Sequence, residues 1–133
     1  MSTVIDHVFL TVSDRERSVE FYSQALKPLG MRHVFDFDGS TAPEWVGDLA
    51  GFGTDTAFTF WLREGDSQGH AAHVGFTAPS REVVDAAHAA AMAAGATDNG
   101  APGERPYFAP GYCAANALDP DGYSLEFTYH GQP

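Results

Sequence analysis

The chain has 133 residues, with 18 acidic and 7 basic side chains, and a formal net charge of −11 at neutral pH. This length is enough for one compact domain with a normal buried core. The negative charge argues against nucleic acid or an anionic membrane as a partner, because both repel an acidic protein. The sequence has no run of about 18 apolar residues, which predicts that no segment spans a membrane.

The cysteine content and the amino-terminal residues favour a cytoplasmic location. The single cysteine, Cys113, cannot form an internal disulfide, which fits a reducing compartment. The start, Met1-Ser2-Thr3, has neither the basic nor the apolar region of a secretory signal peptide, so we expect no such signal. Cys113 falls in a predicted strand, where we expect a small buried apolar residue rather than a nucleophile.

The first half of the chain predicts a strand, then a helix, then further strands. Residues 4–12 are rich in β-branched and aromatic side chains, and Val4, Val8, Leu10 and Val12 make one face of this strand mainly apolar. Such a face needs a helix against it. Ser13 and Glu16 have the spacing of a capping box, which predicts a helix that ends at Pro28 and Gly30. Further strands are expected at residues 31–37 and 57–63.

The second half repeats this pattern at a constant offset of 66 residues. Residues 7–16 return as residues 73–82, with five of the ten positions identical. Ser80 is the expected N-cap of a second helix that ends near Gly95. Strands are predicted at 112–118 and 123–129, joined by the turn Asp119-Pro120-Asp121-Gly122. A period of half the chain indicates two copies of one module, with residues 64–69 as the linker between them.

Two segments resist assignment, residues 38–55 and residues 97–110. Both are rich in Gly, Pro, Asp and Asn, and both are longer than most connections in a compact domain. We therefore expect loops, and long loops of this kind are often functional.

Three residues carry the candidate chemistry: His7, His73 and Glu126. The histidines occupy equivalent positions of the repeat, each on the strand face opposite the helix. Glu126 stands between Leu125 and Phe127, an unusual place for an acid without a partner. Two imidazoles and one carboxylate form a ligand set for Zn, Fe, Mn or Ni that leaves positions open for substrate. A lone histidine in a strand is more often a core or surface residue, and Glu126 alone would fit an exposed sheet face.

The remaining histidines are His33, His70, His88 and His130. They match neither the repeat nor its strand face, so we expect them at the surface. His70 is the main rival to His73 as a ligand, because it lies only three residues away.

A pattern of short motifs covers nearly the whole chain. It consists of residues 5–8 running into 18–22, residues 73–76, and the D-P-D-G turn followed by residues 125–127. The pattern resembles the vicinal oxygen chelate superfamily, which includes glyoxalase I, extradiol dioxygenases, fosfomycin-resistance transferases and bleomycin-resistance proteins. The resemblance implies an α+β fold with one domain over residues 1–133. In it, two βαβββ modules, about 1–66 and 70–133, form a half-open eight-stranded barrel, usually in a homodimer.

The resemblance also implies one divalent metal ion held by His7, His73 and Glu126. Glyoxalase I has a fourth protein ligand, which the 66-residue offset places at Phe60. Neither Phe60 nor its neighbours is a ligand, so the chain departs from glyoxalase I here. It is closer to the three-ligand pattern of dioxygenases and fosfomycin-type transferases.

The leading hypothesis is a glyoxalase-like metalloenzyme of the lyase, isomerase or dioxygenase type. A small substrate would chelate the ion through two neighbouring oxygens, and the ion would act as a Lewis acid. Glu126 is the candidate base as well as a ligand, and Tyr112 is a candidate donor to a bound oxygen, with core packing equally plausible. Arg105, Phe60 and Trp45 are candidate substrate contacts, although a surface ion pair is the stronger interpretation of Arg105.

Two other classes of function compete with this hypothesis. A metal-free protein that binds a cationic antibiotic, like the bleomycin-resistance proteins, fits the net charge of −11. Such a protein does not need the two histidines and the glutamate. A degenerate scaffold or regulatory domain that kept the triad by descent is the third possibility. Metal content distinguishes the first two classes most directly.

Overall fold

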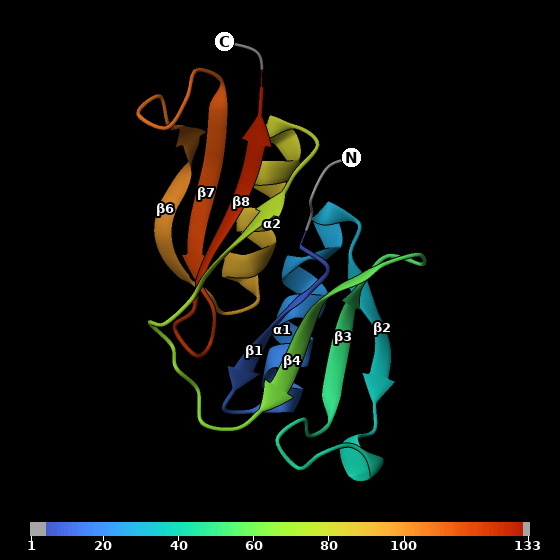
Figure 1. Cartoon of the computed structure of the whole chain (residues 1–133). Coiled ribbons are helices and arrows are strands. Elements are labelled where there is room, and N and C mark those ends of the chain that lie inside the picture. The colour runs from blue at the N-terminus through green and yellow to red at the C-terminus, as the bar shows by residue number, and fades with distance from the viewer. Residues whose placement is uncertain (1–4, 132–133) are drawn as a thin grey trace.

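A computed structural model of the chain describes residues 5–131, which form two modules of identical topology (Figure 1). The first module contains β1 (Val8–Val12), α1 (Arg15–Ala25), η1 (Lys27–Leu29), β2 (Arg32–Phe37), η2 (Gly39–Thr41), β3 (Leu49–Gly53) and β4 (Phe58–Glu64). The second contains β5 (His73–Thr77), α2 (Arg81–Ala93), β6 (Thr97–Glu104), β7 (Tyr112–Leu118) and β8 (Ser124–His130). The α+β fold with two βαβββ modules is thus confirmed.

Each module builds its own four-stranded sheet. The strand orders are β1-β4-β3-β2 and β5-β8-β7-β6, and in each sheet the first and last strands of the module pair in parallel. Strands β1 and β5 are therefore edge strands, and over residues 5–131 no strand of one sheet is hydrogen-bonded to the other sheet. No helix of this part of the chain is long and apolar enough to cross a membrane.

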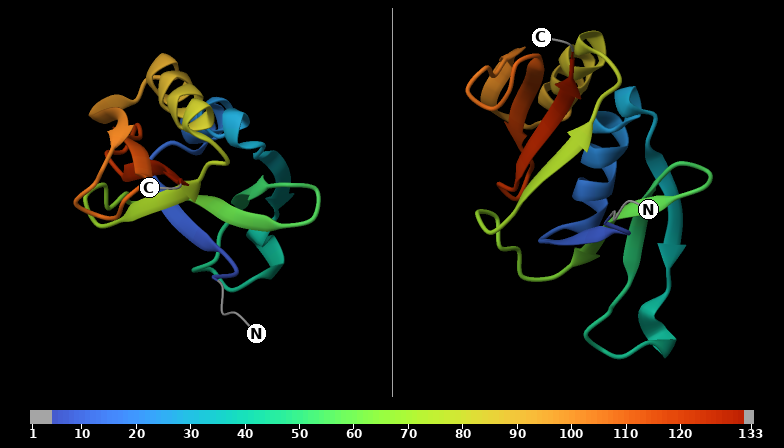
Figure 2. Two further views of the ribbon diagram at one scale, coloured as in Figure 1. Left: turned by 90° about the horizontal axis from the view of Figure 1, so that it is seen from above. Right: turned by 45° about the horizontal axis from the view of Figure 1, so that its top comes forward.

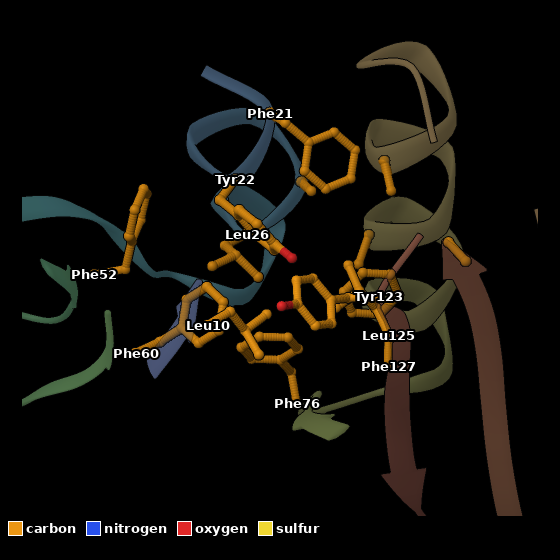
Figure 3. Close-up of a cluster of buried hydrophobic side chains, with 14 of the residues drawn as sticks. Leu10, Phe21, Tyr22, Leu26, Phe52, Phe60, Phe76, Tyr123, Leu125 and Phe127 are labelled. Atoms are coloured by element: carbon orange, nitrogen blue, oxygen red, sulfur yellow. The ribbon is translucent and has the colours of Figure 1, made fainter. Parts of the chain in front are cut away.

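Both helices contribute to one hydrophobic core. Helix α1 covers one face of the first sheet, α2 covers one face of the second, and the helices pack side by side (Figure 2). Figure 3 shows side chains from both helices and both sheets meeting in a single cluster. The Phe60 and Phe76 rings join the two sheets at a centroid distance of 5.3 Å. As the alternation in the sequence predicts, Leu10 and Val12 face this core, whereas Val4 lies outside the described residues.

The first helix begins one residue later than the capping-box prediction. Asp14, not Ser13, is the N-cap, and its carboxylate accepts from the Arg17 amide at 3.0 Å. The Ser13 hydroxyl is occupied elsewhere, because it donates to Asp121 of the second module. The second cap is as predicted, with Ser80 accepting from the Val83 amide.

The prediction of loops at residues 38–55 and 97–110 is wrong in part, because each segment contains a strand. Strand β3 carries two glycines, and Gly51 leaves room for the Trp61 ring, which would lie 2.6 Å from an added Cβ. Strand β6 is rich in Gly and Pro, and its pairing with β7 shifts register on both sides of Gly100. Pairing with a regular neighbour thus outweighs the low strand propensity of these residues.

The D-P-D-G turn fastens the second module to the first. The Tyr22 hydroxyl donates to Asp119 Oδ2 at 2.5 Å, and Asp119 is only 4% exposed. Asp119 Oδ1 accepts from the backbone amides of Asp121 and Tyr123. The Tyr123 hydroxyl reaches back to donate to the Thr11 carbonyl at 2.7 Å. These bonds satisfy buried polar groups, so the turn contributes directly to the packing of the two modules.

Burial changes the acidity of this pair. Burial, followed by the charge of Asp119, raises the pKa of the Tyr22 hydroxyl well above its ordinary value of 10.0. Burial likewise raises the pKa of the Asp119 carboxyl, although the hydrogen bonds from Tyr22 and the turn amides oppose the shift.

Replacing Tyr22 by Phe removes the donor to Asp119 Oδ2 and leaves a buried acceptor unpaired. We expect Tyr22→Phe to lower the free energy of unfolding by about 1–3 kcal/mol at neutral pH. Tyr107→Phe is the matched control, because Tyr107 is 75% exposed and its hydroxyl is open to water. Urea denaturation measures both variants, and an equal effect of the two substitutions would contradict this role for Tyr22.

The effect of Tyr22→Phe depends on pH. As pH rises through 10.0, an unfolded tyrosine loses its proton whereas buried Tyr22 keeps it. The unfolded state then binds fewer protons than the folded state, so this group lowers wild-type stability as pH rises. The variant lacks the group, and its deficit relative to wild type should shrink above that pH. A deficit that stays constant into the alkaline range would count against the assigned pKa shift.

Candidate metal centre

Each sheet has one face that no helix covers, and these two outer faces differ in chemistry. On the first sheet the outer face carries mainly aromatic side chains, among them Phe9, Phe58 and Trp61. On the second sheet the outer face carries polar ones, among them His73 and Glu126. As predicted, His73 and Glu126 lie on the outer face of the second sheet. The predicted first strand is shorter than expected, because β1 begins at Val8, but His7 still borders the outer face of the first sheet.

His73 is held by a serine on the neighbouring strand. Residues His73 and Ser124 are partners in the parallel pairing of β5 with β8. Their side chains meet at 2.7 Å between His73 Nδ1 and Ser124 Oγ. The other ring nitrogen, Nε2, lies 3.2 Å from Glu126 Oε1. An imidazole fixed through one nitrogen presents the other in a defined direction, as metal-ligating histidines do.

Glu126 is nearly buried, at 8% exposure, and is surrounded by donors. The Tyr112 and Thr128 hydroxyls both donate to Oε2. On the other oxygen, Asn116 Nδ2 donates to Oε1 at 3.4 Å, close to His73. Burial acts to raise the pKa of Glu126, but the hydrogen bonds, from Tyr112 first, outweigh it and hold the pKa below its ordinary value of 4.5. The group is therefore a carboxylate at neutral pH.

Tyr112 lines the same cavity as His73 and Glu126, a hollow of about 240 Å³ on the second module. Its hydrogen bond to Glu126, together with partial burial, raises the pKa of the phenol above 10.0, so it remains a donor at neutral pH. Its ring lies 5.0 Å from His130 and 5.1 Å from Phe108. Tyr112 therefore does more than fill the core, because it orients the carboxylate.

His7 lies just before β1 and is oriented in the same manner. Its Nδ1 contacts Asp6 Oδ1 at 2.5 Å, which leaves Nε2 free of that contact. His7 and His73 both line a cavity of about 660 Å³ beside the edge strands β1 and β5. Within residues 5–131 of one chain, however, no three acidic, histidine or cysteine side chains gather closely enough to hold a metal. One chain thus brings His73 and Glu126 together but leaves His7 apart from them.

The strand register corrects the position equivalent to Glu126 in the first module. Glu126 pairs with Gly75 on β5, and the corresponding partner of Phe9 on β1 is Trp61. The offset is therefore 65 residues in this strand rather than 66, and Phe60 faces the core at 1% exposure. Phe60 also borders the 660 Å³ cavity. Trp61 is no metal ligand, so the first module still lacks a fourth ligand.

Two further predicted substrate contacts, Trp45 and Arg105, are not lining residues of the cavities that contain His7 or His73. Trp45 is 72% exposed, and its neighbour Val46 lines the aromatic hollow that also contains His7. Arg105 donates from Nη2 to the Ala101 carbonyl and so braces the bulged strand β6. Cys113 is 4% exposed, as expected, and burial raises the pKa of its thiol, which disfavours a nucleophilic role.

Several residues around His73 and Glu126 were not predicted from the sequence as part of the site. Ser124, Thr128 and Asn116 hold His73 and Glu126, and His130 lines the same cavity. His130 is at the surface, as expected, but it does share the strand face, because it follows Glu126 at even spacing along β8. That alternation was the available signal for Ser124, Thr128 and His130. Asn116 comes from β7, and only the pairing register shows that it lies opposite Glu126.

The other histidines have local roles. His70 is exposed in the connection between the modules. His33 stacks on Phe52 and contacts Asp36, and His88 contacts Asp98. None of these contacts involves Glu126 or a residue that holds it.

Comparisons with known proteins place the fold. The chain is similar to a glyoxalase/bleomycin resistance protein from Albidiferax ferrireducens T118, with 27% identity and a TM-score of 0.74 over 96% of this chain and 98% of that one. It is also similar in structure to a glyoxylase/bleomycin resistance protein/dioxygenase domain from Frankia sp. EAN1pec, with 22% identity and a TM-score of 0.71 over 99% and 100% of the two chains. A third similar structure is that of a glyoxalase/bleomycin resistance protein/dioxygenase family enzyme from Burkholderia phytofirmans PsJN. It has 20% identity and a TM-score of 0.68, over 96% of this chain and 99% of that one.

No curated protein sequence matches the chain. The model of one family matches residues 4–127, which is nearly the whole sequence. The chain therefore belongs to the Glyoxalase/Bleomycin resistance protein/Dioxygenase superfamily.

Proposed function

We propose that the protein is a metal-dependent enzyme of the glyoxalase or dioxygenase type. In this proposal His7, His73 and Glu126 hold one divalent ion, of Zn, Fe, Mn or Ni, and a small substrate chelates it through neighbouring oxygens. The observation that carries the proposal is the pair His73 Nε2 and Glu126 Oε1, 3.2 Å apart on the polar outer face.

The donor set fits a divalent ion. His73 and His7 each use Nδ1 for a protein contact, so both offer Nε2. Glu126 supplies a carboxylate oxygen that other residues already hold in position. Nitrogen and oxygen donors of this kind suit first-row divalent metals, and the supporting hydrogen bonds resemble those around known metal ligands.

A second copy of the chain supplies the missing His7 in this proposal. Within residues 5–131 the edge strands β1 and β5 are unpaired on one side; His73 is the first residue of β5, and His7 lies immediately before β1. Contact between the amino-terminal ends of β1 from one chain and β5 of another would place His7 beside His73 and Glu126 of the second chain. A two-fold axis then generates two such sites and covers both edges.

The ion would supply a Lewis acid that stabilises negative charge developing on two substrate oxygens. The residues of the chain would position that chemistry. Tyr112, Thr128 and Asn116 fix Glu126, and Ser124 fixes His73. Gly75, opposite Glu126, has open space where a side chain would stand, which leaves room for a substrate. For a lyase or isomerase reaction, Glu126 is also the candidate proton acceptor.

Metal analysis of single variants tests the ligand set. Protein purified without chelator should contain about one divalent ion per chain, and His73→Ala should weaken metal affinity at least about a hundredfold. His70→Ala is the matched control, because His70 is exposed and lies only three residues away. Elemental analysis after dialysis provides the measurement. Equal metal content in wild type and His73→Ala would contradict the proposed site.

Mixing two variants that each lack a metal ligand tests whether two chains share one metal site. In a heterodimer of His7→Ala and His73→Ala, one site carries both defects and the other carries none. An equimolar mixture after subunit exchange should therefore regain about a quarter of the wild-type metal per chain. If one chain supplies all three ligands, the mixture stays as metal-poor as the separate variants. Sedimentation should also give twice the chain mass of 14.2 kDa.

Tyr112→Phe tests the support of the carboxylate. The variant loses the hydroxyl that donates to Glu126 Oε2 while it keeps the ring. We expect metal affinity to fall about tenfold or more, as for other residues that hydrogen-bond a metal ligand. Tyr107→Phe, an exposed tyrosine of the neighbouring loop, should leave the affinity unchanged. Unaltered metal binding in Tyr112→Phe would remove Tyr112 from the site.

A second candidate function is metal-free binding of a cationic antibiotic. The aromatic outer face of the first sheet and the net charge of −11 favour it. Metal content separates the two functions, because this candidate predicts the same ligand affinity with and without a chelator.

A further inference from the structure

Arg105 directly follows β6 and shares the outer face of the second sheet with the candidate metal centre. Its backbone amide donates to the Tyr112 carbonyl at 2.8 Å, so the two residues stand opposite each other. The preceding pair, Glu104 and Cys113, faces the helix side, because Glu104 accepts from the first residue of α2 and Cys113 is buried. Neighbouring residues of a strand alternate between faces, so Arg105 belongs to the face of Tyr112 and Glu126.

The guanidinium of Arg105 lies along β6, beside two glycines. Its Nη2 donates to the Ala101 carbonyl at 2.9 Å. A Cβ built on Gly103 would lie 3.4 Å from Nη1, and one built on Gly100 would lie 3.3 Å from Nη2. Larger side chains at these positions would crowd the guanidinium, so the glycines leave room for it on the strand. Strand β6 thus holds a cation in a defined place on the outer face.

Asn116 lies between this cation and Glu126. The Cβ built on Gly100 would also lie 3.4 Å from Asn116 Oδ1, so the Asn116 amide and the guanidinium border one point. On its other side, Asn116 Nδ2 donates to Glu126 Oε1, the oxygen beside His73. Strands β6 and β8 are two strands apart in the sheet, which is about 10 Å (Figure 1). One small molecule is therefore long enough to contact both Arg105 and the His73–Glu126 pair.

The Arg105 guanidinium has no carboxylate partner within residues 5–131, contrary to the surface ion pair expected from the sequence. Four other arginines of this part of the chain form ion pairs, namely Arg15, Arg17, Arg32 and Arg81. Arg63 donates from both terminal nitrogens and stacks over the Phe9 ring. At Arg105, by contrast, no group of the described residues accepts from Nε or Nη1. In a chain of net charge −11, this fixed guanidinium keeps donors free for an anion from solution.

We propose that Arg105 determines the substrate class by binding a carboxylate of the substrate. The planar fork of a guanidinium matches a carboxylate with two parallel hydrogen bonds. The inference rests on the proposed function, in which two neighbouring oxygens of the same molecule bind at His73 and Glu126. The substrate is then a small carboxylic acid, with a short chain between its chelating oxygens and the carboxylate on Arg105.

Two 2-oxo acids of equal chain length test the inference. The probes 2-oxoglutarate and 2-oxopentanoate share the chelating oxygens, and only the first has a distal carboxylate. Titration calorimetry of the metal-loaded protein should show at least about tenfold tighter binding of 2-oxoglutarate. In Arg105→Gln this preference should disappear while the affinity for 2-oxopentanoate stays unchanged. If Arg105 only braces β6, the substitution weakens both probes alike, and that result would overturn the inference.

Two further variants separate the position of the guanidinium from its charge. Gly103→Val keeps every charge but crowds Arg105 Nη1, so it should also abolish the preference for 2-oxoglutarate. Arg32→Gln is the matched control, because it removes a positive charge from an exposed ion pair of the first module and should leave the preference intact. Circular dichroism verifies that each variant is folded. An equal loss in Arg32→Gln and Arg105→Gln would contradict a site at Arg105.

A titration without metal separates this inference from the proposed function. In wild-type protein with a chelator, pentanoate should shift the NMR signal of the Arg105 Nε–Hε group saturably, with a dissociation constant on the order of 1 mM. The neutral isostere pentanamide should leave the signal in place, and Arg105→Gln assigns the signal by its loss. No shift with pentanoate, or equal shifts with both probes, would overturn the inference. Neither result alters the metal analysis of His73→Ala, so each proposal can fail alone.

Discussion

The sharing of one core by both helices is the constraint from which the rest of the structure follows. Helices α1 and α2 pack against each other, so each sheet must turn its helix-bearing face towards the common centre. The opposite faces are then directed outwards, and the repeated histidines lie on them. Phe60 and Phe76 join the sheets inside this core, and the Tyr22–Asp119 hydrogen bond fixes the turn of the second module to the first helix. The site residues depend on this packing although they take no part in it.

The two modules have kept one topology and acquired opposite surfaces. In the second module, the strand position paired with Gly75 is Glu126, which collects donors from β7 and β8. In the first module, the equivalent position is Trp61, which lies on a glycine and joins an aromatic cluster. Such a difference needs no change of fold, because alternate residues of a strand face one surface and can vary independently of the core face. The repeat therefore gives both modules the same fold, and the residues that differ at equivalent positions, such as Trp61 and Glu126, give the two outer faces different chemical properties.

The sequence predicts most strands, both helices and the faces of the site residues well. It predicts poorly the contacts between strands and between modules, for physical reasons. Alternation of apolar residues places His7, His73 and Glu126 on the outer faces, since period-two patterns need no knowledge of the partner strand. Strand β6 could not be predicted in this way, because Gly100 and Pro102 have low strand propensity and only pairing with β7 makes the segment extended. The helix start moved from Ser13 to Asp14 because Ser13 bonds across the module boundary. The separation of His7 from the other two residues is likewise a property of packing, which no local pattern records.

The irregular strands at the outer margins of the sheets restrict how this chain can polymerise. Strand β2 shifts register between His33 and Phe35, and β6 shifts on both sides of Gly100, whereas β1 and β5 run without interruption. A bulged margin is a poor template for a further strand, so open-ended stacking of sheets is blocked at both ends. Only the two regular margins, β1 and β5, remain, and the proposed two-fold contact would cover both of them at once. Assembly through strand pairing is therefore confined to β1 and β5, and the glycines and proline that obscure β6 in the sequence make its edge a poor template for fibre growth.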